Sequence, residues 1–355
     1  MLKRTLLFSA ILFFAQQCVF AAGSFPYSLA DEVIAEAIAD SLIPSAVLCV
    51  VEDGEVSYLQ AYGYRSVVPE HEPMTTHTIF DLASVSKPLG AGTAMLLLCA
   101  EGKASVDDYV SQYIPNSHAD VQIRHLMTHY SGLPAYMTAK RLDSIFHVRG
   151  AEYDQYPDLM IDTIARCTRL SGVGEKYRYS CLNFISLQRV VEKIVGSDIN
   201  SYLRNTHYKA LGLPTMGWLP DDSLNYRIAP TECTDTVCLR GWVHDPLARM
   251  MMRGVSGNAG VFGTAEEVAA WAIWFMNMDD DARRKGCHAG LWTDSVTTSV
   301  GMGTPSCRHT GYTGTSVTVL PKEKRALVLL TNRVHPKDEH NLSTLRKALN
   351  AMLTP

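Results

Sequence analysis

The 355-residue sequence has no large excess of charge of either sign, with 32 Lys and Arg residues against 36 Asp and Glu residues. The formal net charge is −4, so the chain lacks the basic surface that binding to nucleic acid requires. Internal repeats and low-complexity stretches are also absent, which excludes a repeat protein. The apolar content of 47% is that of an ordinary globular protein. We therefore expect small molecules or peptides as partners, and no nucleic acid.

Several motifs of hydrolytic and metal-binding proteins are missing as well. No G-x-S-x-G sequence is present, which argues against an α/β-hydrolase. His125 and His129 have the spacing of zinc ligands on a helix, but Leu126 stands where a metallohydrolase needs glutamate. Structural histidines are therefore the better interpretation. The cysteines show no C-x-x-C pair of the zinc-binding kind. We expect neither a metal nor another cofactor.

An apolar run with the flanks of an export signal lies at the N-terminus. Two basic residues precede the apolar residues 5–15, and small residues near Ala21 suit cleavage there. Two glutamines keep this run short of the ~20 residues that a membrane span needs, and no later segment reads as a span. We predict a signal peptide over 1–21 and a mature protein over 22–355 that is periplasmic or secreted. The alternative is a lipid on Cys18, so membrane contact would come only from the signal or that lipid.

Cysteine usage fits an exported protein. Of nine cysteines, eight remain when Cys18 is removed with the signal. Cys233 and Cys238 lie in a polar segment and are the pair that we expect to form a disulfide, with two free thiols as the alternative. Cys49 and Cys99 lie within apolar runs, where a free thiol packs like a small hydrophobic side chain.

Strand patterns occur near both ends of the chain. Residues 46–51 and 56–62 are rich in β-formers, and Asp53-Gly54 between them is typical of a tight hairpin turn. Residues 314–320 and 325–331 form a second predicted pair. Because each pair has a short connection, the sequence predicts antiparallel pairing.

Amphipathic helices accompany these strands. One is predicted over 28–41, where Ser28 serves as the N-cap and Asp31 completes a capping box. Another is predicted over 343–353 near the C-terminus. We expect both helices to pack on the sheet.

The middle of the chain has the pattern of helices joined by long irregular connections. Helices are predicted over 121–129, 157–170, 182–195 and 265–276. We therefore predict an α/β (α+β) domain, in which residues 28–100 and 302–355 build an antiparallel sheet flanked by helices. A mainly helical region over 101–301 is inserted between these two parts.

The stretch from Phe80 to Pro88 places Ser84 and Lys87 one turn apart at the start of an apolar helix. A proline is tolerated in a helix's first turn, so Pro88 sets the start near Ser84. A serine hydroxyl is a weak nucleophile and needs a base, and a lysine one turn away is within reach. Lys87 can accept a proton if burial under the run to Ala100 lowers its pKa from ~10.4. Ser84 and Lys87 are therefore the candidate nucleophile and base.

Further motifs follow this stretch in order. They are His125-Leu-Met-Thr-His-Tyr-Ser-Gly-Leu-Pro134, Tyr179-Ser180 before a helix, Val243-His244-Asp245 followed by Gly257 to Phe262, and His309-Thr310-Gly311. Together with Ser-x-x-Lys, they make the chain resemble the serine β-lactamase and penicillin-binding-protein superfamily over about residues 28–353. The closest branch is the class C β-lactamase-like one, which includes D-Ala-D-Ala carboxypeptidases, β-lactamases and esterases. The resemblance implies a β-lactamase/transpeptidase-like fold.

The resemblance also implies a role for each matching residue. Ser84 would be the acylated nucleophile, Lys87 its neighbour in proton transfer, and Tyr179 the residue that exchanges a proton with the leaving group. The backbone N–H groups of Ser84 and Tyr312 would form the oxyanion hole. The substrate-binding positions would be Cys181, His309, Thr310 and Gly311.

Two of these positions depart from the family pattern. Cys181 stands where the family usually has Asn or Asp, so it offers no side-chain amide to a substrate. His309 stands where a lysine often begins the motif, and an ordinary pKa near ~6.5 leaves it little charge at neutral pH. Both departures weaken the expectation of β-lactam hydrolysis more than that of an acyl-enzyme. Arg333, after the last strand, is a candidate source of positive charge, with a solvated role as the alternative.

The sequence thus predicts an exported, monomeric serine hydrolase that works through an acyl-enzyme at Ser84. A D-Ala-D-Ala-type cell-wall peptide is the first expected substrate, and a β-lactam or a small ester comes next. An inactive envelope-binding module that keeps the fold is the competing interpretation.

Overall fold

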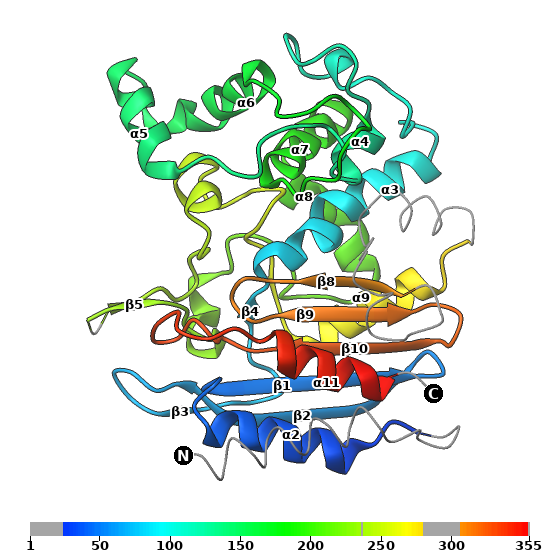
Figure 1. The fold of residues 1–355 in the computed structure, drawn as a ribbon, viewed down its shortest axis with the longest axis vertical. Coiled ribbons are helices and arrows are strands. Elements are labelled where there is room, and N and C mark those ends of the chain that lie inside the picture. Colours follow the sequence, from blue (N-terminus) through cyan, green and yellow to red (C-terminus); the bar gives the residue numbers. More distant parts are fainter. Residues whose placement is uncertain (1–23, 236, 280–305, 354–355) are drawn as a thin grey trace.

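The computed structural model describes residues 24–235, 237–279 and 306–353, so the predicted signal peptide lies outside the described residues. Its centre is a six-stranded sheet in the order β3-β2-β1-β10-β9-β8 (Figure 1). The strands are β1 (Ser45–Glu52), β2 (Glu55–Ser66), β3 (Glu72–Pro73), β8 (Cys307–Thr310), β9 (Ser316–Leu320) and β10 (Arg325–Leu330). β1 pairs antiparallel with β10, which confirms that both ends of the chain build one sheet.

The predicted hairpin is present, and each face of the sheet packs against a separate hydrophobic cluster. Asp53 and Gly54 join β1 to β2 with φ angles of 53° and 80°, the left-handed conformation that a tight turn requires. On one face, Leu48 and Val50 pack with α2 (Tyr27–Ala39) and α11 (Ser343–Leu353). On the other face, Val47 belongs to the main core, which the helical region shares. Alternation along β1 therefore serves two hydrophobic layers.

The start of α2 differs from the prediction. Its N-cap is Pro26 and no side chain caps the helix, so the predicted capping box of Ser28 and Asp31 is wrong. The Asp31 carboxylate instead accepts hydrogen bonds from the hydroxyls of Tyr58, at 2.6 Å, and Tyr62. Both tyrosines lie on β2, so Asp31 joins the helix to the sheet.

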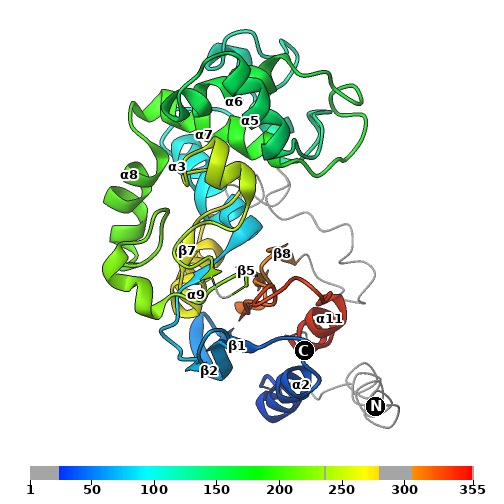
Figure 2. The same cartoon turned by 90° about the vertical axis from the view of Figure 1, so that its left-hand side faces the viewer.

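The helical region lies at one end of the sheet (Figure 2). It contains α3 (Thr93–Ala100), α4 (Ile123–Met127), α5 (Ala139–Val148), α6 (Tyr156–Arg166), α7 (Cys181–Val195) and α8 (Ile199–Leu203), while α9 (Ala265–Met276) packs under the sheet. The capping box of Thr264 and Glu267 at the start of α9 is confirmed. α5 and α8 were not predicted, whereas α9 has its predicted bounds and α4, α6 and α7 end within four residues of theirs.

The helix that follows Ser84 begins as a 3-10 turn (Ala83–Val85), widens into a π-helical segment (Pro88–Gly92) and continues as α3. Pro88 has no N–H to donate to the preceding turn, which fits the wider segment that begins there. Gly90 lies against the indole of Trp218, and an added Cβ would be 2.6 Å from that ring. The small residues of this helix therefore permit close packing, as predicted.

The same helix passes a length and hydropathy test for a membrane span, contrary to the prediction that no later segment would. Its 18 residues, Ala83–Ala100, have a mean hydropathy of 1.2, but 78% of them are buried inside the protein. Such burial is that of a core helix.

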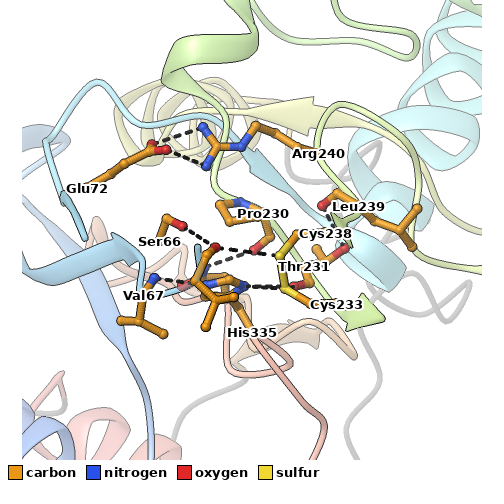
Figure 3. The surroundings of a disulfide bond; sticks show 12 residues. Ser66, Val67, Glu72, Pro230, Thr231, Cys233, Cys238, Leu239, Arg240 and His335 are labelled. Atoms are coloured by element: carbon orange, nitrogen blue, oxygen red, sulfur yellow. Dashed lines mark hydrogen bonds and ion pairs between the residues drawn. A yellow bond between two sulfur atoms is a disulfide. The ribbon is translucent and has the colours of Figure 1, made fainter. Parts of the chain in front are cut away.

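The predicted disulfide between Cys233 and Cys238 is present (Figure 3). It joins β5 (Cys233–Thr234) to β6 (Val237–Cys238). The ring of His335 lies beside it, with Nδ1 3.4 Å from Cys233 Sγ, and its Nε2 accepts a hydrogen bond from the Val67 N–H at 2.9 Å. Because both sulfurs are oxidised, this cluster offers no thiolate pair to a metal. The disulfide instead closes the hairpin, and the Cys233 N–H holds it to the loop after β10 by donating to the Pro336 carbonyl at 2.9 Å.

Candidate active site

Ser84 is partly accessible, although its neighbours on the helix are buried. The backbone just before it is held by the buried carboxylate of Asp81. This carboxylate accepts hydrogen bonds from the N–H groups of Ala83, at 2.8 Å, and His244, at 2.6 Å. Ala83 has a φ of 46°, a costly conformation for a residue other than glycine. The turn that presents Ser84 is therefore fixed by a specific buried contact.

The segment after β8 holds the same turn from the other side. The Thr313 hydroxyl donates to the carbonyl of Asp81 at 2.8 Å, and the Thr315 hydroxyl donates to the carbonyl of Leu82 at 2.9 Å. Gly311 packs directly against this turn, since a Cβ added at Gly311 would lie only 2.6 Å from the Leu82 carbonyl oxygen. The structure thus places the His309-Thr310-Gly311 motif beside the Ser84 turn.

Lys87 is fully buried and lies at the centre of the candidate residues. Its Nζ donates hydrogen bonds to Ser84 Oγ, at 3.0 Å, and to the carbonyl of Asn258, at 2.8 Å. The Sγ of Cys181 is 3.6 Å away, and the ring centroid of Tyr179 is 4.9 Å away. An ammonium has three N–H donors, and Ser84 Oγ, the Asn258 carbonyl and Cys181 Sγ are the three acceptors. The structure therefore brings Ser84, Lys87, Tyr179 and Cys181 together.

The electrostatic state of Lys87 differs from the prediction. Burial lowers the pKa of its ammonium, but the nearby Cys181 and Tyr179 outweigh burial and raise the pKa overall. Burial raises the pKa of the Tyr179 hydroxyl, while the Lys87 charge and hydrogen bonds from Lys87 and Ser84 act to lower it. The resting site therefore holds an ammonium and a phenol. A proton has to leave this pair before either group can act as a base.

Tyr179 is positioned by His129. The Nδ1 of His129 accepts hydrogen bonds from the Ser180 N–H, at 3.2 Å, and from the Asn183 side chain, at 3.1 Å. The rings of His129 and Tyr179 are 4.6 Å apart between centroids. Burial holds the pKa of His129 well below its usual range, so the ring stays neutral and can accept these bonds. His125 caps the start of α4, so the structural interpretation of both histidines is confirmed.

His309 on β8 faces Tyr179 across the site, with 6.2 Å between the ring centroids. Burial, with a contribution from the charge of Lys87, lowers the pKa of His309 to about 3. Its ring is therefore uncharged at neutral pH, in agreement with the small charge expected from the sequence. Thr310, the next residue, is exposed at the end of β8.

Tyr312 follows Gly311, and its side chain is 57% exposed. Its ring stacks near His244, with 5.6 Å between centroids, and the guanidinium of Arg333 lies 4.9 Å from its centroid. The hydroxyl of Tyr312 and the guanidinium of Arg333 both bind the carboxylate of Asp338. The charge of Arg333 is therefore paired with Asp338, and its guanidinium packs on the ring of Tyr312.

The loop before α9 forms the wall behind Lys87. β4 (Phe80–Asp81) pairs with β7 (Phe262–Gly263), and the Val261 N–H donates to Ser86 Oγ at 2.9 Å. The Asn258 carbonyl faces Lys87, as described above, and its side chain donates to Asp245 at 3.2 Å. The ordered motifs 243–245 and 257–262 therefore meet at the Ser84 helix. The two-residue strands β4 and β7, which pair the Ser84 stretch with the end of the second motif, are too short for a periodic pattern to predict.

Comparison with known proteins agrees with this geometry. The family model described as Beta-lactamase matches residues 30–351. A relative from Escherichia coli (strain K12), named "Putative D-alanyl-D-alanine carboxypeptidase", is 27% identical over 94% of this chain and 92% of its own. A relative from Bacillus subtilis (strain 168), named "N-acetylmuramyl-L-alanine amidase", is 27% identical over 86% of this chain and 80% of its own.

Solved structures share the fold. One titled "Beta-Lactamase/D-Alanine Carboxypeptidase from Pseudomonas syringae" has a TM-score of 0.72 and 15% identity, and covers 92% of this chain and 98% of its own. The structure of EstCE1, "a hydrolase with promiscuous acyltransferase activity", has a TM-score of 0.69 and 21% identity, and covers 91% of this chain and 97% of its own. The fold is therefore β-lactamase/transpeptidase-like, and the class of protein is serine hydrolase.

The chain belongs to the beta-lactamase family, within the superfamily of serine β-lactamases and penicillin-binding proteins.

Proposed function

We propose that the chain is an exported serine hydrolase in which Ser84 forms an acyl-enzyme. The observation that carries the proposal is the 3.0 Å contact between Lys87 Nζ and Ser84 Oγ, made by a lysine with no exposed surface. A lysine is rarely buried without a partner, so its placement on a serine hydroxyl supports a role in proton transfer.

Export is supported by two independent features. The N-terminal sequence has the basic, apolar and small-residue order of a signal peptide. The disulfide between Cys233 and Cys238 is of the kind that persists in oxidising compartments. We therefore place the mature enzyme in the periplasm or outside the cell.

The chemistry follows from the positions of the site residues. Ser84 Oγ attacks the substrate carbonyl carbon, and its proton passes to the Tyr179 oxygen after the Lys87–Tyr179 pair has lost one proton. The N–H groups of Ser84 and Tyr312 stabilise the oxyanion. When the bond to the leaving group breaks, Tyr179 returns the proton to the departing amine or alcohol. Water then hydrolyses the ester on Ser84 and restores the serine.

The proposed substrate is a cell-wall peptide that ends in D-Ala-D-Ala. Among the described strands, β8 forms one edge of the sheet, the edge beside Ser84, so an extended peptide can pair with its backbone there. The name of the Escherichia coli relative supports the same substrate class. Thr310 and Gly311 at the end of β8 would line this peptide, and Cys181 would contact it from α7.

A small ester is the second candidate, and the state of His309 favours it. The pKa of this ring is lowered to about 3, so it offers no positive charge to a substrate carboxylate. Arg333 is already paired with Asp338. A neutral ester needs no such charge and would still use Ser84 and the oxyanion hole.

Parallel assays separate these candidates. The mature protein and Ser84→Ala are incubated with a D-Ala-D-Ala-terminated peptide, p-nitrophenyl acetate and a fluorescent penicillin. Release of D-alanine by the wild-type protein alone supports the carboxypeptidase. Ester hydrolysis without D-alanine release supports the esterase, and Ser84-dependent opening of the penicillin supports a β-lactamase. No Ser84-dependent turnover of any of them would leave the inactive envelope-binding module as the better interpretation.

The pH dependence of kcat/KM should show no contribution from the titration of His309. With its pKa lowered to about 3, the ring gains a proton only as the pH falls toward that value, so it stays neutral between about pH 5 and pH 8. We expect kcat/KM for p-nitrophenyl acetate to show no inflection in this range that depends on His309. The profile of His309→Gln, which cannot titrate, should have the same shape. An inflection near pH 6.5 that disappears in His309→Gln would contradict the assigned protonation state.

A further inference from the structure

An arginine on the C-terminal helix α11 contacts the segment between β8 and β9 that carries Tyr312. Nη2 of Arg346 donates hydrogen bonds to the carbonyls of Gly311, at 2.9 Å, and Thr315, at 3.0 Å. The buried residues of α11 pack in the hydrophobic cluster on the opposite face of the sheet from the main core (Figure 1). Arg346 therefore contacts the segment that follows β8 from the face of the sheet that α2 and α11 cover.

The contacted carbonyl belongs to the peptide group that matters most for the proposed chemistry. The Gly311 carbonyl and the Tyr312 N–H are the two ends of one planar trans peptide, and they point in opposite directions. A donor that fixes the carbonyl on one side therefore fixes the N–H toward the other. Gly311 itself lies against Leu82 and Ala83, the residues just before Ser84. The Tyr312 N–H therefore points away from the Arg346 guanidinium, and the contacts of Gly311 place this peptide beside the Ser84 turn.

A charged donor also changes the strength of this peptide as a hydrogen-bond donor. Hydrogen bonds in a chain polarise one another, and bonds from an ionised donor are the stronger kind. The Gly311 carbonyl accepts from Arg346 and from the Gly314 N–H, at 3.2 Å. Both bonds withdraw electron density from the Gly311–Tyr312 amide. The Tyr312 N–H then carries more positive charge where an oxyanion would form.

Arg346 keeps its charge under ordinary conditions. Burial, and after it the nearby charges of Arg333 and Arg308, lower the pKa of Arg346 to about 10, which is still well above neutral pH.

We propose that Arg346 is a positioning residue for catalysis, which orients and polarises the Gly311–Tyr312 peptide so that the Tyr312 N–H stabilises the oxyanion. The inference rests on the proposed function, because it requires Tyr312 to be an oxyanion donor. It adds a residue outside the ordered motifs, from the last helix of the chain, to the machinery for acyl transfer.

The test compares Arg346→Met, Arg346→Lys and the wild-type protein with p-nitrophenyl acetate. Losing a whole oxyanion donor costs about 10²- to 10³-fold in kcat, so weakening one should lower kcat by about tenfold and leave KM nearly unchanged. Arg346→Lys keeps the charge and should recover part of the loss. The matched control is Lys347→Met, which removes a cation from an exposed neighbouring position on α11 and should match the wild-type protein.

A spectroscopic readout separates this role from a structural one. With ester labelled with ¹³C at its carbonyl, rapid-mixing difference infrared spectra give the carbonyl stretch of the acyl-enzyme. The account predicts a higher frequency in Arg346→Met than in the wild-type protein, because the oxyanion hole polarises that carbonyl less. Should Arg346→Met fail to fold, Arg346→Gln and Arg346→Lys give the same comparison.

Two outcomes would overturn the inference in distinguishable ways. If the wild-type protein acylates Ser84 and the folded Arg346 variants keep its kcat and carbonyl frequency, only the role of Arg346 is wrong. If the wild-type protein forms no acyl-enzyme at all, the proposed function fails and the inference fails with it.

Discussion

Replacing Lys87 by methionine is expected to slow acylation of Ser84 by about a thousandfold, the middle of the range for losing a proton-transfer group. Lys87 Nζ is 3.0 Å from the serine hydroxyl, and the charge of Lys87 and its hydrogen bond both act to lower the pKa of Tyr179. Without the Lys87 ammonium, Tyr179 is harder to deprotonate and takes the Ser84 proton less efficiently. The rate is measured by the appearance of a covalent label from a fluorescent penicillin or of the acetyl-enzyme from p-nitrophenyl acetate.

The same substitution should leave the fold in place. Methionine fills much of the volume of the lysine, and because Tyr179 is a neutral phenol at rest, removing the Lys87 charge leaves no opposite buried charge unpaired. The Asn258 carbonyl loses its partner, which costs about 1–3 kcal/mol, less than the stability of a typical domain. The control is Lys103→Met, because Lys103 is an exposed lysine paired with Glu101. Acylation by a folded Lys87→Met at the wild-type rate would remove Lys87 from the mechanism.

Tyr179→Phe is expected to keep substrate binding and to lower turnover by about 10²- to 10⁴-fold. The phenylalanine ring can occupy the same place beside His129, where the tyrosine ring centroid lies 4.6 Å from that of His129. What is lost is the oxygen that receives and returns the proton. The expected signature is therefore a large decrease in kcat with KM nearly unchanged, measured with the best substrate from the parallel assays.

The matched control for this substitution is Tyr177→Phe. Tyr177 lies two residues earlier in the same segment and is 42% exposed. It loses the same hydroxyl group and should retain wild-type turnover. Equal activity of Tyr179→Phe and Tyr177→Phe would show that the phenolic oxygen of Tyr179 takes no part in the reaction.

The parts of the fold that could be predicted are those whose signals are local. Alternating apolar residues and the Asp53-Gly54 turn define the first hairpin, and it forms with the expected conformation. The capping box at Thr264 likewise depends on residues three apart, and both of its hydrogen bonds are present. The capping box predicted for Ser28 and Asp31 does not form, because the Asp31 carboxylate accepts hydrogen bonds from two tyrosine hydroxyls of the sheet instead.

The candidate site divides in the same way. Ser84 and Lys87 are one helical turn apart, so their contact follows from the sequence once a helix is assumed. Tyr179 and His309 required a resemblance to a known family, because nothing local marks them. His129 as the support of Tyr179, and Arg346 as a partner of Gly311, depend on contacts between segments about 35 to 50 residues apart or more. Only the folded chain shows such contacts.

The direction of the Lys87 pKa could not be predicted either. The sequence shows that the helix is apolar, and burial does lower this pKa. It cannot show that Cys181 and Tyr179 lie near the same nitrogen and reverse the net effect. The resting charge of the site therefore depends on two segments, around Lys87 and around Tyr179 and Cys181, that only the fold brings together.

The central claim is that Ser84 becomes acylated, and intact mass spectrometry tests it most directly. The mature protein and Ser84→Ala are each mixed with a D-Ala-D-Ala-terminated peptide, a penicillin and p-nitrophenyl acetate, quenched, and weighed. We expect the wild-type protein to gain the mass of the acyl group from at least one of these compounds, and Ser84→Ala to gain none. An equal gain in both proteins, or no gain in the wild-type protein with any of the three, would contradict it.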